Sequence, residues 1–75
     1  MRVALFPGMD GTGHLFDPLR AELTRRQIDS VALRYPIDGP QDAASIAARL
    51  PDPRGDVLVA ESFGGGVAIH VAART

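Results

Sequence analysis

The feature that most constrains the fold is the stretch over residues 57–66, VLVAESFGGG. Its first four residues form an unbroken aliphatic run, which predicts a buried parallel strand. The glycines after Ser62 predict a helix that starts at once. A strand that passes straight into a helix must turn sharply at the serine, which holds it at a positive φ. Such a turn leaves room only for small residues two positions away on either side, and Ala60 and Gly64 meet this condition.

This pattern is a relative of the G-x-S-x-G nucleophile elbow, with Ala60 in place of the first glycine. The turn would raise the Ser62 hydroxyl above the carboxyl end of the strand, where a substrate can reach it. The backbone N–H of Phe63 would face the same space from the helix N-terminus, where it could stabilise an oxyanion. The alternative is that Ser62 only caps the helix, because serine is a favoured N-cap residue.

The rest of the chain repeats the same alternation of strand and helix. Strands are expected at residues 3–6, within 28–35 and at 57–60, and helices from Asp17 to about Gln27, from Pro40 and after Ser62. This βαβαβα order predicts an α/β fold with three layers, a parallel sheet and right-handed crossovers. The simplest spatial strand order is 2-1-3, so the loops after the first and third strands share one edge. That edge is where doubly wound sheets bind ligands.

Composition excludes several classes of protein. The 75 residues carry 8 basic and 9 acidic side chains, so no strong field attracts nucleic acid. The absence of cysteine excludes disulfides and thiolate zinc sites, and no ligand cluster suggests another metal. No secretory signal or integral membrane segment is expected, which makes the cytoplasm the default location. The last helix continues to the end of the sequence without a cap, so residues 1–75 are expected to be the amino-terminal part of one incomplete domain.

The loop after the first strand supplies the other half of a possible acyl-transfer site. Gly8 lets the backbone turn inward, which makes the N–H of Met9 the expected second oxyanion donor. Asp10 is expected to form a turn with Gly11. The loop lacks the lysine of a P-loop, and no acidic residue ends the second strand, so a nucleotide-binding βαβ unit is disfavoured and no cofactor is expected.

Together, LFPGMDGTG at residues 5–13 and ESFGG at 61–65 resemble the amino-terminal part of an α/β-hydrolase. Within that superfamily they are similar to an esterase, lipase and thioesterase group that includes plant phytyl ester synthase and diacylglycerol acyltransferase-like proteins. The resemblance implies that Ser62 is the nucleophile and that the N–H groups of Met9 and Phe63 form the oxyanion hole. It also implies a catalytic acid and a histidine later in the chain than the serine, beyond Thr75.

The two histidines of the chain do not fit the role of base. His70 lies about 12 Å along the helix from the serine at the usual rise per residue, too far to reach it. His14 precedes the nucleophile, and it is expected either to line the substrate site with Gly8 or to be structural. The leading hypothesis is a serine hydrolase or acyltransferase that acts on a small-molecule ester or thioester through an acyl-enzyme on Ser62. The alternative is a truncated, noncatalytic α/β fragment or interaction module, and either way the chain by itself is expected to be inactive.

Overall fold

The computed structural model describes residues 1–8 and 11–74. Over these residues the elements are β1 (Arg2–Phe6), a 3-10 turn η1 (His14–Phe16), α1 (Asp17–Arg25), β2 (Asp29–Ala32), α2 (Ala43–Arg49), β3 (Val57–Ala60) and α3 (Gly64–Ala73). The predicted alternation of strands and helices is confirmed. Among the helices described, none combines the length and the apolar character needed to cross a membrane.

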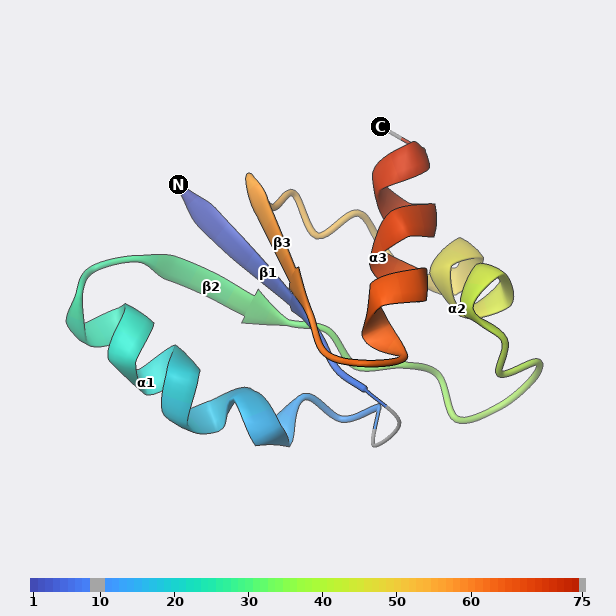
Figure 1. The fold of residues 1–75 in the computed structure, drawn as a ribbon, viewed down its shortest axis with the longest axis horizontal. Coiled ribbons are helices and arrows are strands. Elements are labelled where there is room, and N and C mark those ends of the chain that lie inside the picture. Colours follow the sequence, from blue (N-terminus) through green and yellow to red (C-terminus); the bar gives the residue numbers. More distant parts are fainter. Residues whose placement is uncertain (9–10, 75) are drawn as a thin grey trace.

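The three strands form one parallel sheet in the order β2-β1-β3 (Figure 1). This confirms the predicted order 2-1-3 with the first strand in the centre. Ala4 of β1 lies opposite Val31 on one side and Leu58 on the other. Because β1 is flanked on both sides, Leu5 and Phe6 have no exposed surface.

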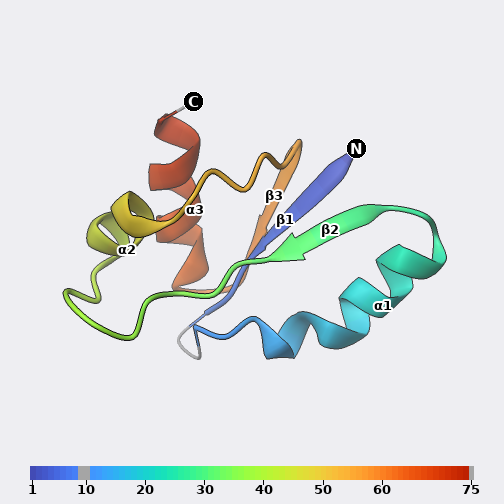
Figure 2. The same ribbon diagram turned by 180° about the vertical axis from the view of Figure 1, so that it is seen from behind.

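Helices cover both faces of the sheet, as Figures 1 and 2 show from opposite sides. Successive residues of β1 point to opposite faces. Val3 and Leu5 pack with Phe16 of η1, on the side of α1. Ala4 and Phe6 belong to the larger core, which α2 and α3 cover; its helical members are Ile46, Ala47, Val67, Ala68 and Val71. The predicted three-layer α/β arrangement is therefore present.

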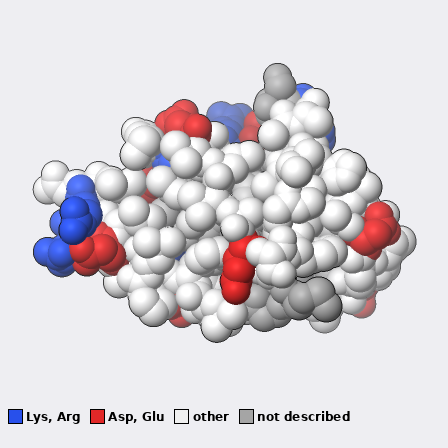
Figure 3. All heavy atoms as spheres, viewed as in Figure 1, with Lys and Arg blue, Asp and Glu red and all other residues white. Residues whose placement is uncertain are grey.

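The prediction that residues 57–60 form a buried strand is wrong. The exposed fractions are 41% for Val57 and 37% for Val59. Among the strands that the structure describes, β3 is an edge strand whose one partner is β1, and α1 packs against β2 at the other side of the sheet. Only Leu58, which faces the larger core, is partly buried there. From the same viewpoint as Figure 1, Figure 3 shows a largely uncharged surface, with one acidic group near the middle of the view and the other charged groups toward its margins.

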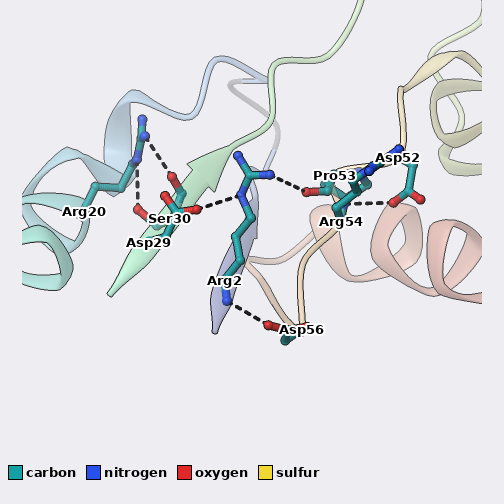
Figure 4. Close-up of polar contacts among 8 residues, drawn as sticks. All are labelled: Arg2, Arg20, Asp29, Ser30, Asp52, Pro53, Arg54 and Asp56. Carbon is teal, nitrogen blue, oxygen red and sulfur yellow. Dashed lines mark hydrogen bonds and ion pairs between the residues drawn. The ribbon is translucent and has the colours of Figure 1, made fainter. Parts of the chain in front are cut away.

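The amino ends of the strands are tied together by polar contacts (Figure 4). The backbone N–H of Arg2 donates to Asp56 Oδ2 over 3.0 Å. The Arg2 Nε lies 3.2 Å from Asp29 Oδ2, an ion pair without the alignment of a hydrogen bond. The Arg20 guanidinium donates to the hydroxyl and carbonyl oxygens of Ser30, which connects α1 to β2. One arginine of the central strand therefore contacts the beginnings of both neighbours.

The helix α2 begins at Ala43, three residues later than Pro40 suggested. Its N-cap is Asp42, whose Oδ2 accepts a hydrogen bond from the Ser45 N–H over 3.0 Å. The Ser45 hydroxyl and then this N–H lower the pKa of Asp42 below its ordinary value of 3.8, because both donate to the ionised carboxylate.

This cap gives the stability of the protein a defined pH dependence. The pKa is lower in the folded chain, so the contribution of Asp42 is complete above its ordinary value and disappears as the pH falls through the folded value. Thermal unfolding from about pH 6 down to about pH 2 should show a smaller loss of stability in Asp42→Asn than in the unmodified protein. Asp38→Asn, in the exposed loop before the helix, is the matched control. Equal losses in all three proteins would contradict this role.

Candidate functional site

Ser62 occupies a strained turn between β3 and α3. Its φ is 49°, in the left-handed region that side chains other than glycine rarely adopt. The strand ends at Ala60 and the helix begins at Gly64, so the chain reverses from one element to the other within three residues. The N-cap of α3 is Phe63, and no side chain of the described residues forms a capping hydrogen bond there. The interpretation of Ser62 as a simple helix cap is therefore wrong.

Two other residues that are not glycine have a positive φ, and both have local explanations. Gln27 follows the end of α1, where helices commonly finish with a left-handed residue. Arg54 lies in a turn in which its N–H donates to Asp52 Oδ1 over 2.8 Å. Ser62 lies instead at the carboxyl edge of the sheet, where strain of this kind is associated with function.

Gly64 makes the turn possible because α3 begins directly against the end of β1. A Cβ atom at this position would lie 2.5 Å from the carbonyl oxygen of Pro7 and closer still to that of Phe6. Real Cβ atoms do not approach backbone oxygens so closely, so no larger residue fits without displacing the helix. The Glu61 N–H also donates to the Phe6 carbonyl over 3.1 Å. The start of α3 and the end of β1 are therefore in direct backbone contact.

The first loop lies beside Ser62, as the strand order predicts. A Cβ built on Gly8 would be 3.7 Å from the Ser62 Cβ and 3.4 Å from the Glu61 carbonyl oxygen. Ser62 is exposed, and within the part of the chain that the structure describes its hydroxyl has no hydrogen-bond partner. Over the same residues nothing accepts a bond from the Phe63 N–H. Met9, the other expected oxyanion donor, lies outside the described residues, as does Asp10.

The Glu61 side chain lies next to the loop that follows β1. Its Cδ lies 3.8 Å from the Cβ position of Gly8, and the residue is otherwise exposed. The side chain is therefore a surface carboxylate that lies near the first loop. A carboxylate is thus present beside the turn, on the side where Gly8 meets Ser62.

Both histidines are exposed. His14 lies beside an acidic residue, and His70 lies further along α3 than the serine turn. The Nδ1 of His14 lies 3.6 Å from Asp17 Oδ2 on the first turn of α1. His14 is not among the residues that line the cavity described next, so its role in substrate binding stays a prediction. His70 belongs to the second half of α3. Among the described residues, neither histidine forms a hydrogen bond with Ser62.

A cavity of about 500 Å³ opens next to the turn. This volume falls in the range of about 300–1,000 Å³ typical of small-molecule sites. Gly8 and Phe63, which flank Ser62, contribute to its wall; the remaining lining residues are Gly11, Thr12, Arg34, Tyr35, Pro36, Ile37, Gln41 and Ile46. Sequence reasoning placed Gly8 at the site, but it assigned no part of the site to residues 36–40. No spacing in that segment marks it as the wall of a cavity.

Tyr35 holds one wall of the cavity to the first loop. Its hydroxyl donates to the Pro7 carbonyl over 2.7 Å, and its backbone N–H donates to the Gly11 carbonyl over 2.8 Å. Its ring also meets that of Phe63 edge to face, with centroids 6.3 Å apart. Tyr35 therefore joins the loops after β1 and β2 to the residue that follows Ser62.

Comparison of the chain with protein-family models, with curated proteins and with solved structures finds no match. A functional assignment therefore depends on the geometry at the carboxyl edge of the sheet.

The contact between Tyr35 and Pro7 can be tested by removing one oxygen atom. Tyr35→Phe leaves the buried Pro7 carbonyl without the hydroxyl donor, which should lower the free energy of unfolding by about 1–3 kcal/mol. Urea unfolding followed by circular dichroism measures the change. An unchanged unfolding midpoint would show that the hydroxyl does not support the loop.

The two glycines at the start of α3 form a matched pair. Gly64→Ala should destabilise the protein by at least about 1–3 kcal/mol, because its Cβ would overlap backbone oxygens at the end of β1. Gly65→Ala is the control, since a Cβ there meets nothing within 4 Å. It should stabilise the helix by roughly 0.5–1 kcal/mol. Equal effects of the two substitutions in urea unfolding would refute the proposed close approach.

Proposed function

We propose that this chain carries the nucleophile of a serine hydrolase or acyltransferase that acts on an ester or thioester. The observation that carries the proposal is the conformation of Ser62. A residue other than glycine is held at a φ of 49° between a strand and a helix, with its side chain exposed. This is the conformation that a nucleophile elbow requires, because it directs the hydroxyl away from the sheet.

The surroundings of Ser62 support the same proposal. The loop after β1 approaches the Ser62 turn at Gly8. The second oxyanion donor is expected in this same loop. The Phe63 N–H is at the start of α3, where the helix dipole favours negative charge. The β2-β1-β3 order also agrees with the resemblance of the two loop sequences to the amino-terminal part of an α/β-hydrolase.

The proposed reaction begins with attack of the Ser62 Oγ on the acyl carbonyl carbon while a base takes the hydroxyl proton. The electron pair of the carbonyl moves to its oxygen, and the N–H groups of Phe63 and Met9 stabilise this oxyanion. Collapse of the intermediate expels the alcohol or thiol, which receives the proton, and leaves an acyl-enzyme on Ser62. Water or an acceptor alcohol then repeats the sequence and releases the acyl group.

The proposal takes the base and the acid from residues after Thr75, as the family resemblance implies. The alternative, a noncatalytic fragment or module, is favoured by one observation. Within the described residues, no histidine is bonded to Ser62, and the Nδ1 of His14 lies 3.6 Å from Asp17 Oδ2. Under both proposals the 75-residue chain should not turn over a simple aryl ester by itself.

A fluorophosphonate probe distinguishes the nucleophile from the alternative. It forms a covalent bond with an activated serine, so the complete protein that carries this chain should be labelled, and Ser62→Ala should abolish labelling. Ser30→Ala is the matched control, because Ser30 lies in β2 and its hydroxyl accepts a hydrogen bond from Arg20. The Ser30→Ala protein should still be labelled at Ser62. Labelling that persists in Ser62→Ala, located by mass spectrometry of peptides, would exclude Ser62 as the nucleophile.

A further inference from the structure

One charged side chain, that of Arg34, lines the cavity beside Ser62. Arg34 is exposed, follows the end of β2 and lines the cavity. It is the one charged residue among those that form the described wall. The neighbouring surfaces are mainly apolar and come from Tyr35, Ile37 and Phe63. A cation beside an apolar cavity is suited to a ligand with an apolar body and an anionic end.

The other arginines show that Arg34 is available to a ligand. Six arginine side chains bind carboxylates, a hydroxyl or backbone carbonyls of this chain: Arg2, Arg20, Arg25, Arg26, Arg49 and Arg74. Over the described residues, the guanidinium groups of Arg34 and Arg54 have no such partner. Arg54 lies in the loop before β3, at the opposite edge of the sheet, and does not line the cavity. Arg34 alone combines a free guanidinium with a position at the cavity.

The charges around the site also differ from one side to the other. Glu61 lies over Gly8, beside the Ser62 turn. An anionic end of a substrate would be repelled from this side and attracted to Arg34 within the cavity. The acyl carbonyl would then be left near Ser62, while the far end of the acyl chain enters the cavity. The two charges would thereby fix the direction in which the substrate binds.

We infer that the cavity selects compounds whose apolar chain ends in an anionic group, a carboxylate or a phosphate, and that Arg34 binds this group. For the enzyme, the substrate class becomes esters or thioesters of acyl chains with an anionic far end. This last step rests on the proposed function, whereas the selection of anions by the cavity does not. The ligand class can therefore be tested by binding alone.

Tyr35 provides a direct measurement of binding. It is the single tyrosine of a chain without tryptophan, and it lines the cavity. Its fluorescence at low micromolar protein should respond to hexanoate, hexyl phosphate, hexanamide and hexylamine, none of which emits. A charge-assisted bond to Arg34 should make the Kd of hexanoate about tenfold lower than that of hexanamide, with hexylamine weakest. The anion with the lower Kd, hexanoate or hexyl phosphate, identifies the preferred anionic group.

Variants assign the preference to one side chain. Arg34→Gln should bring the Kd of hexanoate to that of hexanamide, and Arg34→Lys should keep part of the difference. Arg26→Gln is the control: it removes the same charge at the carboxyl end of α1, away from the cavity, and should keep the full preference for hexanoate over hexanamide. Equal affinity for hexanoate and hexanamide in the unmodified protein would overturn the inference without any variant. A preference that survives Arg34→Gln would overturn the role of Arg34.

The outcome separates this inference from the proposed function. Anion selection measured in Ser62→Ala needs no nucleophile, so it should equal that of the unmodified protein. Anion selection without fluorophosphonate labelling of Ser62 would refute the enzyme and keep the binding site. Labelling of Ser62 without anion selection would keep the enzyme and refute the substrate class.

Discussion

The close approach of Gly64 to the end of β1 is the constraint on which the rest of this edge depends. The first residue of α3 lies against the carbonyl oxygens of Phe6 and Pro7, with no space for a Cβ atom. Because the helix begins there, the chain has only Glu61, Ser62 and Phe63 in which to leave β3 and reverse direction. The left-handed conformation of Ser62 is the result of that short connection. Within the described part of the chain, backbone contacts hold this strain, and the serine side chain has no partner there.

Much of the architecture could be predicted because it depends on local patterns. The apolar runs and the glycine and proline turns identified all three strands, and the simplest arrangement of three strand–helix units then gave the strand order. The same reasoning brought Gly8 and Ser62 to one edge, where their Cβ positions are 3.7 Å apart.

The parts that could not be predicted depend on contacts between distant segments. An aliphatic run does not reveal whether a strand is covered on both faces, so the exposure of Val57 and Val59 was missed. The cavity was missed for a similar reason. Its wall is held by a bond from the Tyr35 hydroxyl to the Pro7 carbonyl, 28 positions earlier in the chain. The turn residues at 36–40 carry no periodic signal that would place them there.

The central position of β1 also determines the order in which the chain can complete its sheet. The residues Val3 to Phe6 are enclosed in the finished fold, yet they are synthesised before the other two strands and gain their second neighbour only when Val57 to Ala60 have emerged. At ordinary rates of translation this interval lasts roughly 3–10 s. During that time β1 has at most the strand β2 and the helix α1 beside it. The most deeply buried strand of the sheet therefore has one edge unpaired during this interval.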